Sequence, residues 1–346
     1  MIVDRIYKYL DGKGVDIGEH VLKLAMSRVH KTLTRNLGVR EDRKRRKTIG
    51  GSTEWYCPRR AYYSMTGAPK ERYSARSRIA FLMGDILQAV VDICATQAGV
   101  EFAYPNTSGE ELELDVTIEG VRVVAHIDHA LKLADEGLVV FDSKSMADHT
   151  FYRFEAAATD PLAEWRQIEM WGYVAQLRFY MWLVELTGLG TGQRGAFIGI
   201  NKNTGHMAEL WVDRCEDTIA MFRRAVPGLT GMVSAYDRAA ATVRETVLAQ
   251  GGSPEDAELA CEAVPRIVDH GLPPRPVWAR TIELPGSNKR ADGSKGPVVQ
   301  VDVGKENTGG QGFRCSYCPF TELCYPGFEP VYLKGGPKYR KALETS

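Results

Sequence analysis

The sequence predicts an α/β protein in which helices flank a central mixed β-sheet. Two groups of β-branched and apolar runs, at 121–146 and 195–213, are each typical of a hairpin, and helical patterns precede, separate and follow them. This order of elements predicts helices packed against a sheet. It lacks a regular βαβ alternation, with no GxGxxG after a strand and no GxxxxGK[ST], which disfavours a Rossmann dehydrogenase and a P-loop motor.

The first third of the chain is expected to contain helices and a charged, loop-like stretch that ends near residue 48. Residues 1–48 begin with a helical pattern and become strongly charged, and 53–66 is expected to start a helix after Pro58. From 76 to 98, apolar residues recur every three or four positions, which predicts an amphipathic helix. These residues are Ile79, Leu82, Met83, Ile86, Val90 and Ile93.

The hairpins are predicted from the runs themselves. "VRVVAHIDHALKL" (121–133) and "GLVVFDSKSM" (137–146) stand on either side of "ADEG", and "GAFIGINKNTGHMAELWVD" (195–213) is expected to turn at Asn203–Gly205. The other stretches are expected to be helical, except for a mobile, loop-rich segment at 285–312 that is rich in Gly, Lys and Asp. The expected helical stretches are 162–188, which Gly172 interrupts, 215–249 and 254–269.

Composition sets broad limits on the class of protein. The chain has 346 residues, of which 44% are hydrophobic and 25% charged, with zero net charge, which is ordinary globular usage. It has no apolar run of 18 residues and does not begin like a signal peptide, so a cytoplasmic location without a membrane is expected. In a reducing compartment, seven cysteines favour metal ligands or buried thiols over disulfides.

One stretch is strongly basic. "RVHKTLTRNLGVREDRKRRK" (28–47) contrasts with the neutral balance of the whole chain. A solvated arm and a contact with a phosphate backbone both account for it.

Two carboxylates and a lysine are expected to converge in the first hairpin. Asp142 and Lys144 are two positions apart on a predicted strand, so their side chains point to the same face. Asp128, on the preceding run, can lie opposite them across the hairpin. Such a set suits Mg²⁺ or Mn²⁺ and a phosphodiester, with the lysine orienting water. A surface Asp–Lys pair on an edge strand is the alternative.

Two further pairs have helical spacing. Gln176 and Tyr180 are four apart, as are Gly84 and Gln88, so each pair shares one face of its helix. Taken alone, Gln176 and Tyr180 are ordinary helix residues. Near the C-terminus, Cys315, Cys318 and Cys324 fall within ten residues, whereas zinc sites and iron–sulfur clusters usually need four cysteines.

Taken together and in this order, the motifs resemble those of the PD-(D/E)XK nuclease superfamily, in its RecB-like branch with the Cas4 exonucleases. The family pattern of GxxxH, GxxD, (D/E)xK and QxxxY is matched by Gly84…Gln88, Ala125…Asp128, Asp142-Ser-Lys144 and Gln176…Tyr180. Gln88 replaces the family's metal-binding histidine, which leaves open an altered metal preference or a weakened enzyme. Ala125 replaces the usual glycine.

The resemblance implies a restriction-endonuclease-like fold and a metal-dependent deoxyribonuclease, an exonuclease on single-stranded or frayed DNA ends. DNA is the expected partner, together with a helicase, a recombinase or a CRISPR integrase. The implied segments are a helical and basic N-terminus, a nuclease core, a helical region, a cluster segment and a tail, at 1–50, 51–214, 215–284, 285–330 and 331–346.

The same resemblance implies a role for each site residue. Asp128, Asp142 and the main-chain carbonyl of Ser143 would hold Mg²⁺ or Mn²⁺, with Gln88 as a tentative further ligand. Lys144 would position the attacking water, and Gln176 and Tyr180 would contact the phosphate or the scissile strand. His126, two residues before Asp128, is either a strand histidine or a further group at the site.

Cas4-like proteins also have one cysteine before the core and three after it. "YCPRRAYY" supplies Cys57, which with Cys315, Cys318 and Cys324 would hold a [4Fe–4S] cluster that joins the N- and C-terminal segments. Zinc is the alternative occupant. Cys94, Cys215 and Cys261 are expected to be buried thiols. A catalytically inactive DNA-binding module is the alternative function, and a metal phosphohydrolase with "HIDH" on a helix is a weaker one.

Overall fold

A computed structural model of the chain describes eleven stretches and a few single positions between 19 and 34. The stretches are 2–12, 49–50, 58–68, 70, 75–104, 111–160, 173–262, 280–284, 299–303, 328–332 and 338–342. The chain divides into two compact units. The first combines Met1–Tyr56 with Tyr73–Gly228, and the second combines Cys57–Arg72 with Leu229–Ser346. The five segments predicted from the sequence remain a prediction.

The first unit is built around a mixed β-sheet, as the sequence predicted. The sheet has the strand order β2-β5-β6-β7-β8, in which β6 and β7 are parallel and the other neighbours antiparallel. The five strands are β2 (Phe102–Tyr104), β5 (His129–Leu133), β6 (Gly137–Met146), β7 (Arg194–Asn201) and β8 (Met207–Asp213). A smaller sheet has the order β1-β4-β3, formed by β1 (Ile49–Gly50), β4 (Val121–Ile127) and β3 (Leu112–Ile118).

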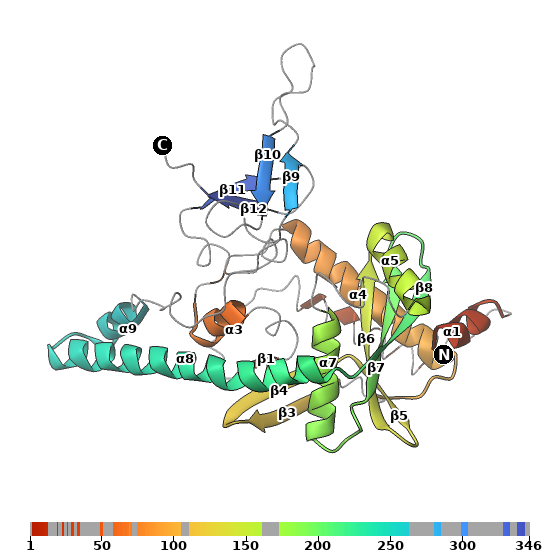
Figure 1. The fold of residues 1–346 in the computed structure, drawn as a ribbon, viewed down its shortest axis with the longest axis horizontal. Helices are drawn as coiled ribbons and strands as arrows, with labels where there is room; N and C mark the ends of the chain where they lie inside the picture. Colours follow the sequence, from red (N-terminus) through yellow and green to blue (C-terminus); the bar gives the residue numbers. More distant parts are fainter. Residues whose placement is uncertain are drawn as a thin grey trace, which may run out of the picture. The chain divides into compact units, whose positions relative to one another are not determined.

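Helices cover both faces of the five-stranded sheet (Figure 1). Helices α1 (Ile2–Leu10) and α4 (Ala75–Gln97) pack on one face, and α5 (Asp148–Thr159) and α7 (Tyr173–Leu186) pack on the other. Close packing on the second face depends on Gly199 of β7, where a β-carbon would collide with the ring of Phe154. The mixed sheet between helices confirms the predicted α/β class.

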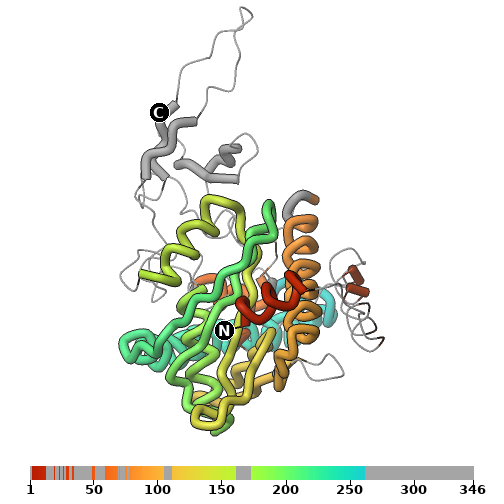
Figure 2. The backbone as a smooth tube through the Cα atoms, turned by 90° about the vertical axis from the view of Figure 1, so that its right-hand side faces the viewer, coloured from red at the N-terminus to blue at the C-terminus, as the bar shows by residue number. Residues whose placement is uncertain are grey.

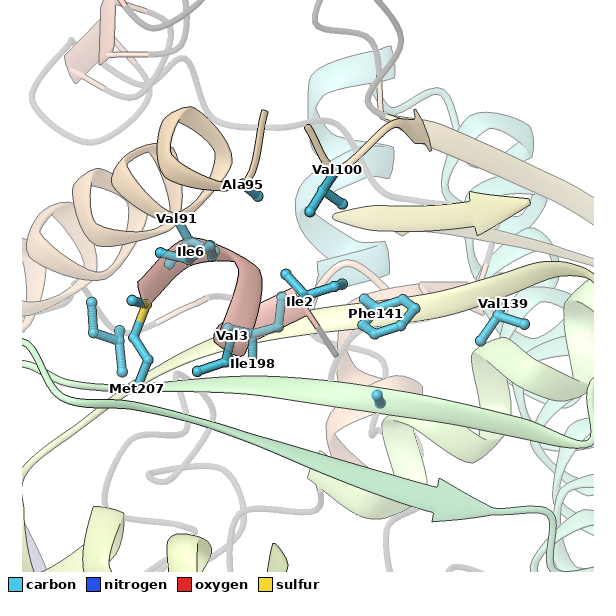
Figure 3. Close-up of a cluster of buried hydrophobic side chains, with 12 residues drawn as sticks. Ile2, Val3, Ile6, Val91, Ala95, Val100, Val139, Phe141, Ile198 and Met207 are labelled. Carbon is cyan, nitrogen blue, oxygen red and sulfur yellow. The ribbon is translucent and has the colours of Figure 1, made fainter. Parts of the chain in front are cut away.

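The core on the first face lies between α1, α4 and the strands (Figure 3). Ile6 of α1 and Val91 of α4 are almost fully buried and meet Phe141 of β6 and Ile198 of β7 in one cluster. Alternation along β6 sends Val139 and Phe141 into this core. It therefore directs Asp142 and Lys144 to the opposite face, toward α7.

Helix α1 is fixed to strand β8 through a buried carboxylate. The main-chain N–H groups of Ile2 and Val3 donate to Oε2 of Glu209, at 2.7 and 3.2 Å, and the indole of Trp211 donates to Oε1 at 2.9 Å. The first N–H groups of a helix have no partner within the helix, so Glu209 satisfies two of them. Figure 2 shows α1 lying beside α4.

Replacing Glu209 by Gln is expected to lower the free energy of unfolding by about 1–3 kcal/mol. Glutamine has one acceptor oxygen, so either the two helix N–H groups or the indole N–H loses its acceptor in a buried setting. Urea titration followed by circular dichroism measures the change. Glu113→Gln, at a side chain that is 56% exposed on β3, is the matched control and should stay within about 0.5 kcal/mol. Equal stability of the two variants would contradict this assignment.

The predicted strand 121–133 is wrong in one respect. The chain bends at Asp128, so that β4 ends at Ile127 in one sheet and β5 begins at His129 in the other. The hairpin of β5 with β6 and the hairpin of β7 with β8, which turns at residues 202–205, are both confirmed. The strands on either side of the bend belong to different sheets, and the apolar pattern alone does not reveal this.

Helix α4 is confirmed, but its predicted apolar face is buried only in part. Ile79, Met83 and Val90 are 53%, 48% and 42% exposed, whereas Leu82 is buried. The side that packs against the core of the sheet includes Val91 and Ala95. By length and composition alone, Arg78–Gln97 would suffice to cross a membrane, a test that core helices of folded domains also pass.

In the second unit, the described elements are helices and two small sheets. Helix α8 (Glu216–Ala249), which begins in the first unit, extends into it, and α9 (Pro254–Glu262) is bound to α8 by an Arg244–Glu258 ion pair of 2.6 Å. These helices and α3 (Pro58–Met65) agree with the predicted helical stretches, whereas 161–172 and 263–269 lie outside the described residues. The sheets pair β9 (Arg280–Leu284) with β10 (Val299–Val303) and β11 (Phe328–Tyr332) with β12 (Lys338–Ala342).

Candidate active site

Strand β6 brings Asp142 and Lys144 together on the face that α7 covers. The Lys144 ammonium donates to Oδ1 of Asp142 at 2.7 Å, and the two side chains are 16% and 4% exposed. Ser143 lies between them, on the opposite side of the pleat, and its buried hydroxyl has no hydrogen-bond partner among the described residues. A buried ion pair at the interior of a sheet is costly to form, so this is not the surface Asp–Lys pair of the alternative interpretation.

Asp128 joins this pair from the bend between β4 and β5. Its carboxylate lies close enough to Asp142 to share a proton with it, and close enough to the side-chain amide of Gln88 on α4 to accept from it. The structure therefore brings three of the predicted residues into one group and adds Gln88 to it. Whether the amide oxygen of Gln88 binds a metal stays a prediction.

The pKa values of the two carboxyl groups shift in opposite directions. Burial raises the pKa of Asp142 to about 7; the charge of Lys144 opposes this rise and the charge of Asp128 adds to it. Burial also raises the pKa of Asp128, but the charges of Lys144 and His129 outweigh it, so that this pKa lies below its ordinary value. Two acids in contact cannot both ionise cheaply, so Asp128 carries the negative charge first.

Lys144 remains a cation in this setting. Burial lowers the pKa of Lys144, but the negative charges of Asp142 and Asp128 outweigh burial and raise it above its ordinary value. The ammonium can therefore hold a water molecule or an anionic oxygen by charge as well as by hydrogen bonds.

Helix α7 presents Gln176 and Tyr180 to the same region. The amide of Gln176 donates to the hydroxyl of Tyr180 at 2.8 Å. Burial and the negative charge of Asp142 hold the pKa of Tyr180 well above its usual range, so its hydroxyl stays protonated. The neutral phenol can donate to a phosphate oxygen.

Tyr173 is a residue of the site that sequence reasoning missed. The Lys144 ammonium lies 4.8 Å from the centre of the Tyr173 ring, in a cation–π contact. Tyr173 precedes Gln176 by three residues and Tyr180 by seven, so all three share one face of α7. This spacing is the sequence signal from which Tyr173 could have been identified as a residue of the site.

The remaining predicted residues are not among those that the structure places at this site. His126 is 58% exposed and lies 3.7 Å from Glu113 on the neighbouring strand β3. Cys94 and Cys215 are half-buried, not buried as expected, whereas Cys261 is buried and its thiol contacts the carbonyl of Ala240. The four cysteines predicted to hold a cluster, Cys57, Cys315, Cys318 and Cys324, lie outside the described residues.

The donor set fits a hard divalent cation. Within the described stretches, no group of three or more His, Cys, Asp or Glu side chains is arranged to hold a metal ion. Mg²⁺, however, is usually held by one or two carboxylates together with waters. Asp128 and Asp142 supply two carboxylates in mutual contact, whose repulsion a cation would relieve.

Carboxylates beside a lysine on a central strand, with a glutamine and a tyrosine from a covering helix, fit the hydrolysis of a phosphodiester bond. The chain belongs to the PD-(D/E)XK nuclease superfamily, whose family model matches residues 28–325. Membership implies hydrolytic nuclease activity with DNA as the substrate, and these nucleases typically use divalent metals.

Two further comparisons are less informative. No curated protein matches the sequence. The crystal structure of SSO0001 is similar to this chain at 17% sequence identity, over 62% of this chain and 87% of that one, with a TM-score of 0.32. A similarity this distant says nothing about function.

Proposed function

We propose that the protein is a Cas4-like, RecB-like exodeoxyribonuclease that hydrolyses single-stranded or frayed DNA ends with Mg²⁺ or Mn²⁺. The observation that carries this proposal is the contact of Asp128 and Lys144 with Asp142 in a buried site of a superfamily nuclease. An inactive binding module has no physical reason to maintain two buried carboxylates and a buried lysine.

Each residue of the site has a role in the proposed reaction. Asp128, Asp142 and the Ser143 carbonyl would hold the cation, which when bound supplies an activated water and neutralises phosphate charge. Lys144 orients the attacking water and stabilises the negative charge that develops on the phosphate. Tyr180 and Gln176 donate to the phosphate or the scissile strand, and the Tyr173 ring keeps the ammonium of Lys144 in place.

The proposal includes a [4Fe–4S] cluster on Cys57, Cys315, Cys318 and Cys324. One observation supports it: Cys57–Arg72 and Leu229–Ser346, which flank the active-site residues in the sequence, fall in the same compact unit. Any strand separation would come from this part of the chain or from a partner helicase, because the chain has no P-loop motif.

Cleavage of end-labelled DNA with Mg²⁺, Mn²⁺ or EDTA tests the proposal. We expect linear single strands to be degraded from an end with either metal, circular single strands to survive, and EDTA to abolish activity. Tight DNA binding without cleavage under every condition would instead establish the inactive module. Cleavage of circles at the rate of linear strands would establish an endonuclease.

Replacing Tyr173 by Leu is expected to slow DNA cleavage about tenfold, since a desolvated cation–π contact is worth up to about 2 kcal/mol. Tyr173→Phe keeps the aromatic face and should stay within about twofold of the wild type. Single-turnover rates at saturating DNA measure the difference. Tyr152→Leu, at an exposed tyrosine of α5, is the control. Equal rates for Tyr173→Phe and Tyr173→Leu would show that the ring face has no role.

A further inference from the structure

Helix α4 contacts two consecutive residues, Asp128 at the bend and His129 at the start of β5, with two residues of its own. Gln88 forms a hydrogen bond with Asp128, and Asp92, one helical turn later, contacts Nε2 of His129 through Oδ1. Residues four apart share a helix face, so one face of α4 holds both residues at this bend.

The Asp92–His129 pair is deeply buried. His129 is 0% exposed and Asp92 4%, and the Phe102 ring lies 4.9 Å from the imidazole. A buried polar pair contributes little net stability, because apolar residues of similar volume usually serve the fold as well or better. A purely structural explanation of this pair is therefore weak.

The position of Asp128 depends on what holds the bend. Asp128 lies between β4 and β5 and belongs to neither strand, whereas His129 is paired with Phe141, the residue next to Asp142. Fixing the His129 ring to α4 therefore fixes the backbone from which the Asp128 carboxylate extends toward Asp142.

We propose that Asp92 and His129 are positioning residues for the metal site, holding Asp128 in the orientation in which it and Asp142 share one cation. This rests on the proposed function of Asp128 as a metal ligand. Outer partners of metal ligands typically change metal affinity 10- to 100-fold when they are removed. We expect the removal of Asp92 and His129 to lower metal affinity by a similar factor.

The test replaces both partners by leucine, as Asp92→Leu with His129→Leu, so that no polar group is left unpaired. Mn²⁺ binding to the DNA-free protein is measured by electron paramagnetic resonance, and the thermal unfolding midpoint by circular dichroism. We expect Mn²⁺ affinity to fall 10- to 100-fold with little or no loss of the unfolding midpoint, a combination that a merely structural role would not give. His129→Gln, which keeps a donor toward Asp92, should bind Mn²⁺ within about threefold of the wild type.

Two controls separate the possible outcomes. Glu209→Gln destabilises the fold and should leave Mn²⁺ affinity unchanged, whereas Asp128→Asn should remove most of it. Wild-type affinity in the double variant, with loss in Asp128→Asn, would overturn the positioning role and leave the metal site standing. Wild-type affinity in Asp128→Asn would overturn the metal site and the positioning role with it. If the double variant does not fold, the near-isosteric Asp92→Leu, which removes the acceptor of His129, replaces it under the same criteria.

Discussion

Asp142→Asn and Lys144→Met should each reduce the rate of DNA cleavage by on the order of 10³-fold or more, while the protein keeps its fold. Asp142 is the carboxylate that contacts both other charged groups of the site, so its neutral amide would weaken metal binding and remove the negative charge that Lys144 meets at 2.7 Å. Lys144→Met keeps the length of the side chain and removes the ammonium that orients the water in this proposal. Single-turnover cleavage of labelled DNA measures both effects.

Matched substitutions outside the site complete this experiment. Asp115→Asn, at an exposed carboxylate of β3 paired with Arg122, and Lys132→Met, at an exposed position of β5, make the same chemical changes. Both should retain activity within about twofold, as surface changes away from a site usually do. A folded Asp142→Asn or Lys144→Met protein that cleaves at the wild-type rate would show that the active site lies elsewhere.

Cys57→Ala is expected to eliminate the iron–sulfur cluster and to lower stability by roughly 5 kcal/mol. Cys57 precedes Cys315 by 258 residues, so a cluster that joins them closes most of the nuclease core into one loop. The stabilisation gained by restricting the unfolded chain in this way is a large share of the roughly 5–15 kcal/mol that stabilises a typical domain. Iron and sulfide analysis of anaerobically purified protein, with thermal unfolding, measures the loss.

The other cysteines provide the control for the cluster. Cys94→Ala, Cys215→Ala and Cys261→Ala should keep full iron content, even where the buried Cys261 thiol contributes to packing. A colourless protein with one zinc would preserve the four-cysteine site and refute the iron–sulfur cluster. Unchanged metal content in Cys57→Ala would place the fourth ligand elsewhere in the chain.

Local periodicity was sufficient to predict part of the site. Two-residue alternation on β6 correctly placed Asp142 and Lys144 on one face, and four-residue spacing on α7 placed Gln176 beside Tyr180. These contacts depend only on the geometry of a single strand or helix, which is regular. The α/β class followed in the same way from the order of helical and strand patterns.

Contacts between different helices and strands could not be predicted from local periodicity. Tyr173 meets Lys144 across 29 positions of sequence and Asp92 meets His129 across 37, and neither pairing leaves a local periodic signal. The buried face of α4 was predicted only in part for a related reason, since Val91 and Ala95 pack against the sheet while Ile79 and Met83 are exposed. The apolar pattern of a helix does not show which of its apolar residues pack against other elements of the fold.

The attachment of α1 to β8 also has a consequence for self-association. Strand β8 ends the order of the five-stranded sheet, and edge strands invite pairing with strands of other molecules. The Tyr7 hydroxyl of α1 accepts the N–H of Met207 at 2.6 Å and faces its carbonyl at 3.4 Å, so it occupies the main-chain groups that a foreign strand would need. Helix α1 thus shields the start of β8, and loosening α1 would expose main-chain groups of Met207 to pairing with a strand of another molecule.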